Sequence, residues 1–242
     1  APDDDTAPQE WDRLNCASAV EVPTPEPVAI DASGAWFGAP ALVMRRLNGR
    51  PLHAPADLDT WLREIAQALI AVAGGPRRGV PAAVRERRPW QPPRGLRLTA
   101  LTGPAVDLLQ RELPKVPRRG QVFAHCDFHP GNLLWSRGRL SGVVDWSAAR
   151  LAPRAWDVAY CRADLCVLLG LRAADRMLEH YERISGARLE HLPLYDLACG
   201  LSALRWSHLW AGAYAEQGRR DLTTGKVKAR SAALVRRSLA RL

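Results

Sequence analysis

The sequence predicts an α+β fold, in which a small β-rich N-terminal piece is followed by a larger and mostly α-helical piece. Short apolar runs bounded by proline and glycine turn signals occupy the first 50 residues and recur between residues 120 and 146. After Ala148, almost every segment instead repeats its apolar residues at helical spacing. The 242 residues, of which 47% are hydrophobic, suffice for one large domain or two small ones.

The elements of the N-terminal half follow from these local signals. The expected elements are a helix over 10–20, strands over 27–31 and within 35–47, a turn at Asn48–Pro51, an amphipathic helix over 57–73 and a short helix over 104–113. The helix over 57–73 gathers its apolar residues on one face, and Asp57 or Asp59 can cap it. The segment Gly74–Arg97 is rich in proline, glycine and arginine, which predicts a long irregular connection.

A β-hairpin is predicted where a strand over 120–127 runs into the sequence NLLWSRGRLSGVVDW, residues 132–146. A turn centred near Gly138–Arg139 places Asn132 opposite Asp145 in this antiparallel pair. Directly opposed residues have Cβ atoms only about 4.5–5.5 Å apart, so both side chains can point at one small site. The helices expected after the hairpin cover residues 155–170, 174–185, 195–218 and 226–242.

The chain is basic, with a formal net charge of +9 carried almost entirely by arginine. A basic balance suggests a phosphate-bearing partner, either nucleic acid or nucleotide, although an arginine-rich codon usage explains it equally well. The arginines of the Gly74–Arg97 segment are interleaved with only one aromatic residue, Trp90, and no helix-turn-helix or RNA-binding signature accompanies them. The sequence therefore favours a nucleotide over a nucleic acid.

The five cysteines, an odd number without a CxxC pair, indicate neither a disulfide framework nor a zinc ribbon. Reduced thiols in a cytoplasmic protein are the simplest interpretation. The first residues are acidic and lack the apolar core of a signal peptide, and the longest apolar stretches are too short to span a bilayer. No membrane partner is therefore expected.

The stretch HCDFHPGNLLW, residues 125–135, concentrates polar side chains between apolar residues. Asp127, Asn132 and Asp145 together form a set of hard oxygen donors, which suits Mg²⁺. With a nucleotide phosphate, such a set implies phosphoryl transfer: one carboxylate orients or deprotonates the attacking hydroxyl, and the other two groups hold the metal. Two alternatives remain: a transition-metal site, such as a zinc site, built from His125, Cys126, Asp127 and His129, and a purely structural turn.

The pattern H-x-D-x-x-x-x-N over residues 125–132, followed by a hairpin and Asp-Trp, resembles the aminoglycoside phosphotransferase and choline kinase-like family. Residues 37–51 are similar to the family's stretch that joins two lobes, and residues 149–160 to the segment after the metal-binding aspartate. The resemblance extends over residues 10–214. It implies a protein-kinase-like fold and transfer of the γ-phosphoryl group of ATP or GTP to a hydroxyl of a small molecule, such as an antibiotic, an amino alcohol or a sugar-like metabolite.

The resemblance also implies an organisation and a role for individual residues. Residues 1–47 would form a partial N-lobe and hinge, and residues 48–242 a helical C-lobe with the catalytic loop and metal site. Asp127 would be the catalytic base and Mg²⁺ would lie on Asn132 and Asp145. The remaining roles would be nucleotide binding by Met44, Arg45 and Leu47 and structural support by His125, His129 and Asp157.

The N-terminal region departs from the family pattern. A glycine-rich phosphate loop and a strand lysine are expected before the hinge, but neither is present before Met44, and the first lysine is Lys115. Glu10 could be the helix glutamate that such a lysine would pair with. We therefore expect a chain that starts inside its N-lobe, binds ATP poorly and turns over slowly. The alternative is a non-catalytic, pseudokinase-like binding module.

Trp206, Trp210 and Tyr214 recur at intervals of four residues, so they are expected on one face of a helix. Such a stripe could box a cationic amine, although core packing is the favoured interpretation. Asp164 and Glu182 could meet a cationic substrate, but acidic residues on helices are more often solvated.

Overall fold

The computed structural model describes residues 6–85, 89–117 and 120–242, which form an α+β structure. The chain divides into two compact units, each built from two stretches of sequence. The first unit comprises Ala1–Arg87 and Gly120–Asp157, and the second comprises Arg88–Arg119 and Val158–Leu242. Because these units are defined by packing, they do not test the lobe boundary that the sequence places at residue 47, and that boundary stays a prediction.

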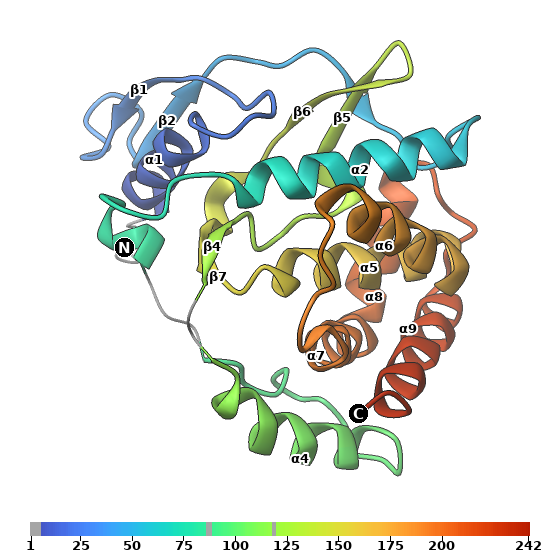
Figure 1. Ribbon diagram of the computed structural model, residues 1–242. Coiled ribbons are helices and arrows are strands. Elements are labelled where there is room, and N and C mark those ends of the chain that lie inside the picture. Colours follow the sequence, from blue (N-terminus) through green and yellow to red (C-terminus); the bar gives the residue numbers. More distant parts are fainter. Residues whose placement is uncertain (1–5, 86–88, 118–119) are drawn as a thin grey trace. The chain divides into compact units, whose positions relative to one another are not determined.

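The first unit combines helices with short strands (Figure 1). Its elements among the described residues are α1 (Thr6–Ala17), β1 (Pro27–Asp31), β2 (Ala41–Met44), β3 (Arg50–Pro51), α2 (Leu58–Ala73), α3 (Ala82–Arg85), β4 (Val122–Ala124), β5 (Leu133–Ser136), β6 (Arg139–Val143) and β7 (Arg150–Ala152). All pairings are antiparallel: β1 with β2, β5 between β3 and β6, and β4 with β7.

The predicted strand over 27–31 is confirmed, whereas the strand expected within 35–47 covers only Ala41–Met44. The reason lies in Asp31, a buried residue whose carboxylate accepts hydrogen bonds from the backbone N–H groups of Ala35, Trp36 and Phe37. These bonds curl residues 32–38 into a loop. They also lower the pKa of Asp31, because they favour its charged form over the effect of desolvation.

The hairpin predicted over residues 132–146 exists, but the predicted register is wrong by one residue. Arg137 and Gly138 both have positive φ, which gives a two-residue turn centred between them, and Ser141 is an extra residue on β6. As a result, Leu133 faces Val143, and the carbonyl of Asn132 accepts a hydrogen bond from Val144 rather than facing Asp145 (3.0 Å). Asp145 lies just beyond the ladder.

Helix α2 supports this hairpin from one side. The predicted cap is confirmed at Asp57, whose carboxylate accepts from the N–H of Thr60. Further along α2, Trp61 stacks on Trp135 of β5, with ring centroids 5.9 Å apart. The buried Glu64 accepts from the N–H of Leu140 at 2.7 Å, and its other oxygen pairs with Arg139 next to it.

The segment Gly74–Arg97 is less irregular than predicted, because it contains the short helix α3. The backbone N–H groups of Val84 and Arg85 donate to the carbonyl of Pro81, which starts this turn of helix. Residues 86–88 of the segment lie outside the part that the structure describes.

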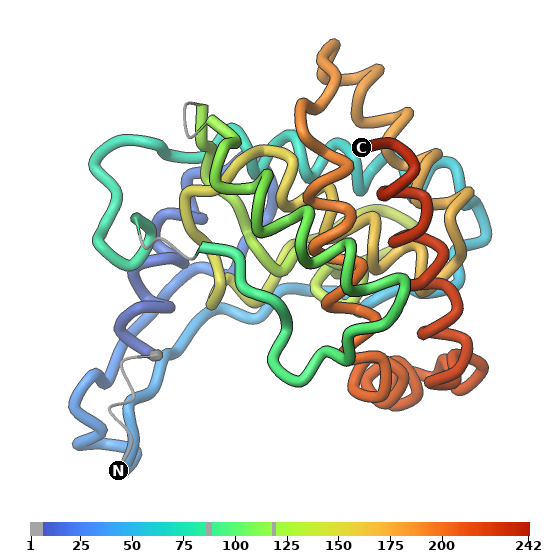
Figure 2. Tube along the Cα trace, turned by 90° about the horizontal axis from the view of Figure 1, so that it is seen from below, coloured from blue at the N-terminus to red at the C-terminus, as the bar shows by residue number. Residues whose placement is uncertain are grey.

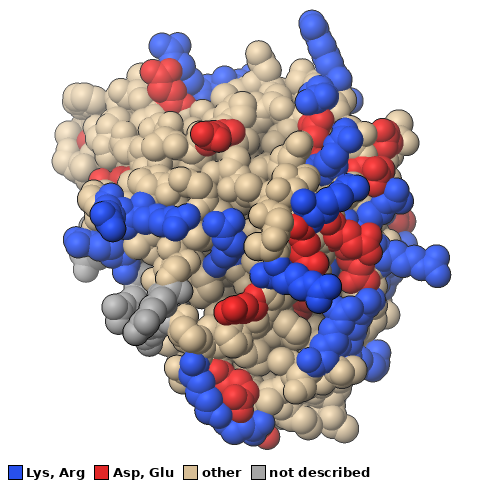
Figure 3. All heavy atoms as spheres, viewed as in Figure 1, with Lys and Arg blue, Asp and Glu red and all other residues tan. Residues whose placement is uncertain are grey.

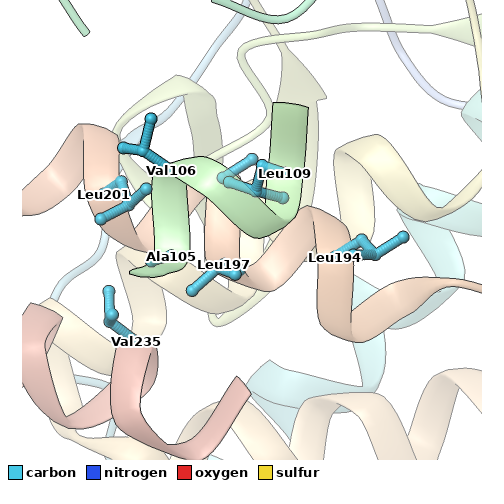
Figure 4. Close-up of a cluster of buried hydrophobic side chains, with 8 residues drawn as sticks. Ala105, Val106, Leu109, Leu194, Leu197, Leu201 and Val235 are labelled. Carbon is cyan, nitrogen blue, oxygen red and sulfur yellow. The ribbon is translucent and has the colours of Figure 1, made fainter. Parts of the chain in front are cut away.

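The second unit is helical in its described residues. Its helices are α4 (Thr102–Glu112), α5 (Ala155–Leu169, which begins in the first unit), α6 (Leu171–Ser185), α7 (Leu192–Arg205), α8 (Ser207–Glu216) and α9 (Thr224–Leu239). Helix α9, red in Figure 2, packs along α7. Figure 4 shows the apolar side chains that α4, α7 and α9 bury against one another, Leu109, Leu197 and Val235 among them.

The helix expected over 195–218 is two helices, since the backbone leaves helical geometry at Trp206. The three aromatic residues Trp206, Trp210 and Tyr214 therefore do not form an open cage for a cationic amine. Arg205 already covers the ring of Trp206, with the guanidinium 4.2 Å from its centroid, and Tyr214 is buried. Tyr214 donates a hydrogen bond to Asp164, which is buried rather than solvated as the sequence suggested.

No helix among the described residues combines the length and the apolar character needed to cross a membrane. On the face drawn in Figure 3, the basic and acidic side chains are intermixed and do not merge into one continuous basic area. A nucleic acid would need such an area to follow its phosphates.

Candidate active site

The candidate site lies where two hairpin strands of the first unit end. Strand β4 leads into the loop of His125 and Asp127, and a 3-10 turn over Pro130–Asn132 leads from that loop into β5. Strand β6 then returns the chain to Asp145. Because the N–H of Val144 donates to the carbonyl of Asn132, the two ends of the hairpin stay side by side at this point.

The side chain of Asn132 is fixed by Asp127. Its amide nitrogen donates to the backbone carbonyl of Asp127 at 3.0 Å and approaches the carboxylate oxygen Oδ2 at 3.4 Å. Since the amide nitrogen of Asn132 is already hydrogen-bonded to Asp127, the amide oxygen is the atom that can bind a cation. Both residues are half-buried, so their polar groups remain partly accessible.

Asp145 is exposed and has left-handed backbone geometry, with φ 61° and ψ 69°. A non-glycine residue adopts this conformation only where its surroundings hold it. The hydroxyl of Ser147 donates to the Asp145 carboxylate at 2.5 Å. The next residue, Trp146, is buried and donates from its indole nitrogen to the carbonyl of Val143.

His125 supports the loop from inside and is fully buried. Its Nε2 donates to the carbonyl of Val144 at 2.9 Å, and its Nδ1 accepts from the N–H of Asp127 at 3.3 Å. One nitrogen donates and the other accepts, which corresponds to the neutral imidazole. Burial lowers the pKa of His125 to about 4, because the charged form loses its hydration.

Asp157, in the first turn of α5, holds the backbone of the same loop. Its two carboxylate oxygens accept from the N–H groups of His125 and Cys126, each at 2.7 Å. Cys126 has a positive φ of 65°, and these bonds hold its peptide in that conformation. Burial raises the pKa of Asp157 to about 6, although the two N–H groups favour the charged form.

His129 lies beside Asp127 rather than behind the loop. Its Nε2 is 3.7 Å from the Asp127 carboxylate, and its Nδ1 accepts from the N–H of Gly131. His129 thereby caps the 3-10 turn that delivers Asn132. The structural role that the resemblance implies for His129 stays a prediction.

The predicted hinge residues form part of the same unit. The N–H of Arg45 donates to the carbonyl of Glu26, and the two side chains form an exposed ion pair. Leu47 packs against Gly142 of β6, so closely that a Cβ at Gly142 would lie 2.3 Å from it. The predicted hinge thus contacts β6, which ends at Val143, two residues before Asp145, and Met44 is 37% exposed.

Two residues that hold the candidate site in place were not predicted from the sequence. Arg13 of α1 is buried and donates to the carbonyl of Ser147, 134 residues away, and Glu64 holds the hairpin tip from α2. Helix α1 packs on the 3-10 turn over Trp146–Ala148. Glu10 of the same helix is near enough for the charge of Asp145 to add to desolvation in raising the pKa of Glu10.

The oxygen donors fit a hard cation better than zinc. Within residues 6–85, 89–117 and 120–242, no three His, Cys, Asp or Glu side chains are arranged to hold a metal ion. His125 and Cys126 are both buried, and His125 uses both nitrogens in hydrogen bonds to the protein. What remains is one amide oxygen and the carboxylates, a donor set suited to Mg²⁺, which takes few protein ligands and keeps water and phosphate.

The comparisons agree with this geometry. The family model described as the phosphotransferase enzyme family matches residues 2–194. Chains of solved structures also match, and aminoglycoside phosphotransferases are among them. The chain therefore belongs to the phosphotransferase enzyme family and has its protein-kinase-like fold, as the resemblance implied.

Two of these structures illustrate the likeness. A thermostable mutant of aminoglycoside phosphotransferase APH(4)-Ia, in a ternary complex with ADP and hygromycin B, is 18% identical, with a TM-score of 0.62 over 94% of this chain and 82% of that chain. APH(3'')-Id from Streptomyces rimosus, in complex with ADP and streptomycin, is 19% identical, with a TM-score of 0.64 over 84% of each chain. No curated protein matches this chain.

Proposed function

We propose that the first unit carries the active site of a Mg²⁺-dependent kinase, which moves the γ-phosphoryl group of ATP or GTP to a hydroxyl of a small molecule. One observation carries the proposal: the hairpin keeps Asn132 beside Val144–Asp145, while the Asn132 amide nitrogen is held by Asp127. A base and two oxygen ligands are thereby collected at one end of the hairpin, which is the arrangement that phosphoryl transfer requires.

In this proposal, Asp127 is the catalytic base. Its carboxylate is half-buried and lies next to the Asn132 amide and 3.7 Å from His129, so its direction is restricted. It would accept the proton of the acceptor hydroxyl as that oxygen attacks the phosphorus. Asn132 and Asp145 would hold Mg²⁺, which neutralises the charge of the transferred phosphate. His125, His129 and Asp157 would act only by fixing the loop.

The nucleotide would meet the backbone of Met44, Arg45 and Leu47, because the hinge is joined to β6 through Leu47 and Gly142. Related structures contain ADP, AMP-PNP or GDP, which supports a purine nucleotide as donor. The sequence has no lysine before Lys115. Since a lysine normally holds the nucleotide phosphates, we propose weak nucleotide binding and slow turnover.

The test compares three proteins: the parent chain, Asp145→Asn and Asp127→Asn. Calorimetric titration with ADP, in the presence and absence of Mg²⁺, should show Mg²⁺-dependent binding in the parent that Asp145→Asn loses. Asp127→Asn should still bind but should not transfer phosphate. Binding without dependence on Mg²⁺ or Asp145 would contradict the proposal, and so would full transfer by Asp127→Asn.

The acceptor is proposed only as a class, a small molecule with a free hydroxyl. Relatives of this fold have been crystallised with hygromycin B and with streptomycin. Release of ADP should therefore be measured with aminoglycosides, amino alcohols and sugars in parallel. In the structure none of the five cysteines is joined in a disulfide, in keeping with a proposed cytoplasmic location.

The alternative is a non-catalytic, pseudokinase-like module, which the lack of an early lysine favours. The two functions predict different results for the same titration. The module would bind Mg²⁺–ADP in an Asp145-dependent manner but would release no ADP with any acceptor. An enzyme would release ADP with one acceptor class, and Asp127→Asn would abolish that release.

A further inference from the structure

Arg13 is an unusual residue for the helix on which it lies. Its side chain is only 5% exposed, although arginine is rarely buried without partners. The guanidinium donates from Nη1 to the backbone carbonyl of Ser147 and from Nη2 to the side chain of Gln9 at 3.3 Å. A buried cation that reaches a carbonyl 134 residues away holds that carbonyl in place.

Ser147 is the link between this cation and the proposed metal ligand. While its carbonyl accepts from Arg13, its hydroxyl donates to the Asp145 carboxylate at 2.5 Å. On the other side of Asp145, the carbonyl of Val144 accepts from His125 at 2.9 Å. The residue before Asp145 and the residue two positions after it are therefore held by side chains from elsewhere in the first unit.

The backbone at Asp145 makes these bonds necessary. Its left-handed conformation is unfavourable for a residue with a side chain and persists only under external restraint. The carboxylate itself is exposed, so packing does not fix its direction. What fixes it is the chain of bonds from α1 through Ser147.

We propose that Arg13 is a positioning residue for Asp145, setting the direction in which this carboxylate offers an oxygen to a divalent cation. The role rests on the proposed function, because it concerns the same cation site. Helix α1 then positions Asp145 in addition to its packing role, because Arg13 reaches Ser147 only while α1 is packed on the 3-10 turn over Trp146–Ala148. Removing the guanidinium releases Ser147, and the carboxylate samples more directions.

A merely structural role for Arg13 makes a different prediction. Helix α1 also packs on β1, β2 and α3, so it retains contacts when one side chain is lost. A structural arginine would change the free energy of unfolding and leave the cation affinity of the folded protein unaltered. The affinity of the folded fraction is therefore the decisive quantity.

The experiment measures Mn²⁺ binding by electron paramagnetic resonance, with the full chain and saturating ADP, and far-UV circular dichroism gives the folded fraction. The variants are Arg13→Met, Arg13→Lys and Ser147→Ala, with Asp145→Asn to show whether the Mn²⁺ binding depends on Asp145. Asn15→Ala is the matched control, because Asn15 lies on the same helix, is exposed and bonds only within it. ADP affinity without metal is measured for each variant.

Arg13→Met should weaken Mn²⁺ binding about tenfold, and Ser147→Ala about threefold, with ADP affinity in the absence of metal unchanged. Arg13→Lys should recover part of the loss, since an ammonium group can still donate to the carbonyl. If Arg13→Met does not fold, Arg13→Lys and the exposed Ser147→Ala decide the question.

Two negative outcomes are distinct. If Mn²⁺ binding in the parent is Asp145-dependent but equal in all folded Arg13 and Ser147 variants, the role of Arg13 is overturned and the proposed function stands. If the parent shows no Asp145-dependent Mn²⁺ binding, the proposed function fails and this role fails with it.

Discussion

The two compact units use their buried polar side chains in different ways. In the first unit, Asp157, His125 and Arg13 each hold backbone groups of the loop and hairpin that carry the candidate site. In the second unit, the fully buried Arg162 is paired with the side chains of Asp196 and Asp175 on neighbouring helices. Polar bonds thus shape loops in one unit and join helices in the other.

The buried polar groups of the first unit therefore determine the geometry of the candidate site, whereas those of the second unit contribute to the stability of its helix packing. The backbone of the first unit takes unfavourable conformations at Cys126 and Asp145, and polar anchors are what maintain them. The second unit relies more on the apolar packing of α4, α7 and α9, although His191, just before α7, also has a positive φ of 58°. Substitutions in the second unit should therefore lower stability, whereas substitutions at the anchors should also change the site.

The largest effect is expected in the apolar core of the second unit. Leu197 is fully buried between α4, α7 and α9, so Leu197→Ala leaves a cavity and should lower the free energy of unfolding by about 3 kcal/mol. Urea unfolding followed by circular dichroism measures the loss, and the partly buried Leu108 provides a milder control as Leu108→Ala. Affinity for Mg²⁺–ADP should not change while the protein is folded; a parallel fall would mean that this core also shapes the site.

A pH dependence of similar size is expected from His125 in the first unit. Its pKa is lowered to about 4 by burial, against an ordinary value of 6.5 in the unfolded chain. Between these values only the unfolded chain binds the proton, so the contribution of His125 to stability is complete above pH 6.5 and decreases as the pH falls towards 4, by about 3 kcal/mol in total. Asp157 contributes with the opposite sign in this range, because its pKa is raised to about 6, so the comparison of the parent with His125→Asn is needed to isolate the histidine.

Urea unfolding at pH 7, 5.5 and 4.5 measures this dependence for the parent and for His125→Asn. The variant should be less stable at pH 7 but should lose less stability between pH 7 and 4.5, because it has no imidazole to protonate. An identical pH slope in both proteins would show that another group is responsible.

Glu64 anchors the hairpin tip and should give an intermediate effect. Glu64→Ala removes the acceptor of the Leu140 N–H and should cost about 2 kcal/mol, the usual value for a hydrogen bond to a charged group. Arg139→Ala should cost less, since Arg139 is 76% exposed and water replaces it. Because the hairpin carries Asn132, Glu64→Ala should also weaken Mg²⁺–ADP binding in calorimetry; unchanged binding would show that the tip and the site are independent.

Local patterns were enough to predict much of the fold. The strand over 27–31 and the helix capped by Asp57 depend on residues close together in the sequence, and both are confirmed. The hairpin was predicted as well, but its register was not, because a positive φ at Arg137 and an extra residue at Ser141 cannot be read from an apolar pattern. The break in the helix at Trp206 was not predicted either, because the residues on both sides of it favour helix.

The candidate site shows the same limit at longer range. Asp127, Asn132 and Asp145 were found because their pattern in the sequence is specific. Arg13 and Glu64 were not, since their partners lie 134 and 76 residues away and nothing in the local sequence points to them. Long-range polar anchors of this kind become visible only when the chain is folded.

The smallest effect is expected at a helix end of the second unit. Thr223 caps α9, its hydroxyl accepting from the N–H of Lys226 at 3.3 Å. Thr223→Ala removes an acceptor for one of the free N–H groups of the first turn and should lower the free energy of unfolding by about 0.5–1 kcal/mol. The neighbouring Thr224→Ala is the matched control, because Thr224 is the first residue inside the helix. Thermal unfolding should separate the melting temperatures of the two variants by a few degrees. The affinity for Mg²⁺–ADP should stay that of the parent, because this cap holds a helix end and no part of the loop around Asp127. Equal melting temperatures would show that the α9 cap contributes nothing measurable.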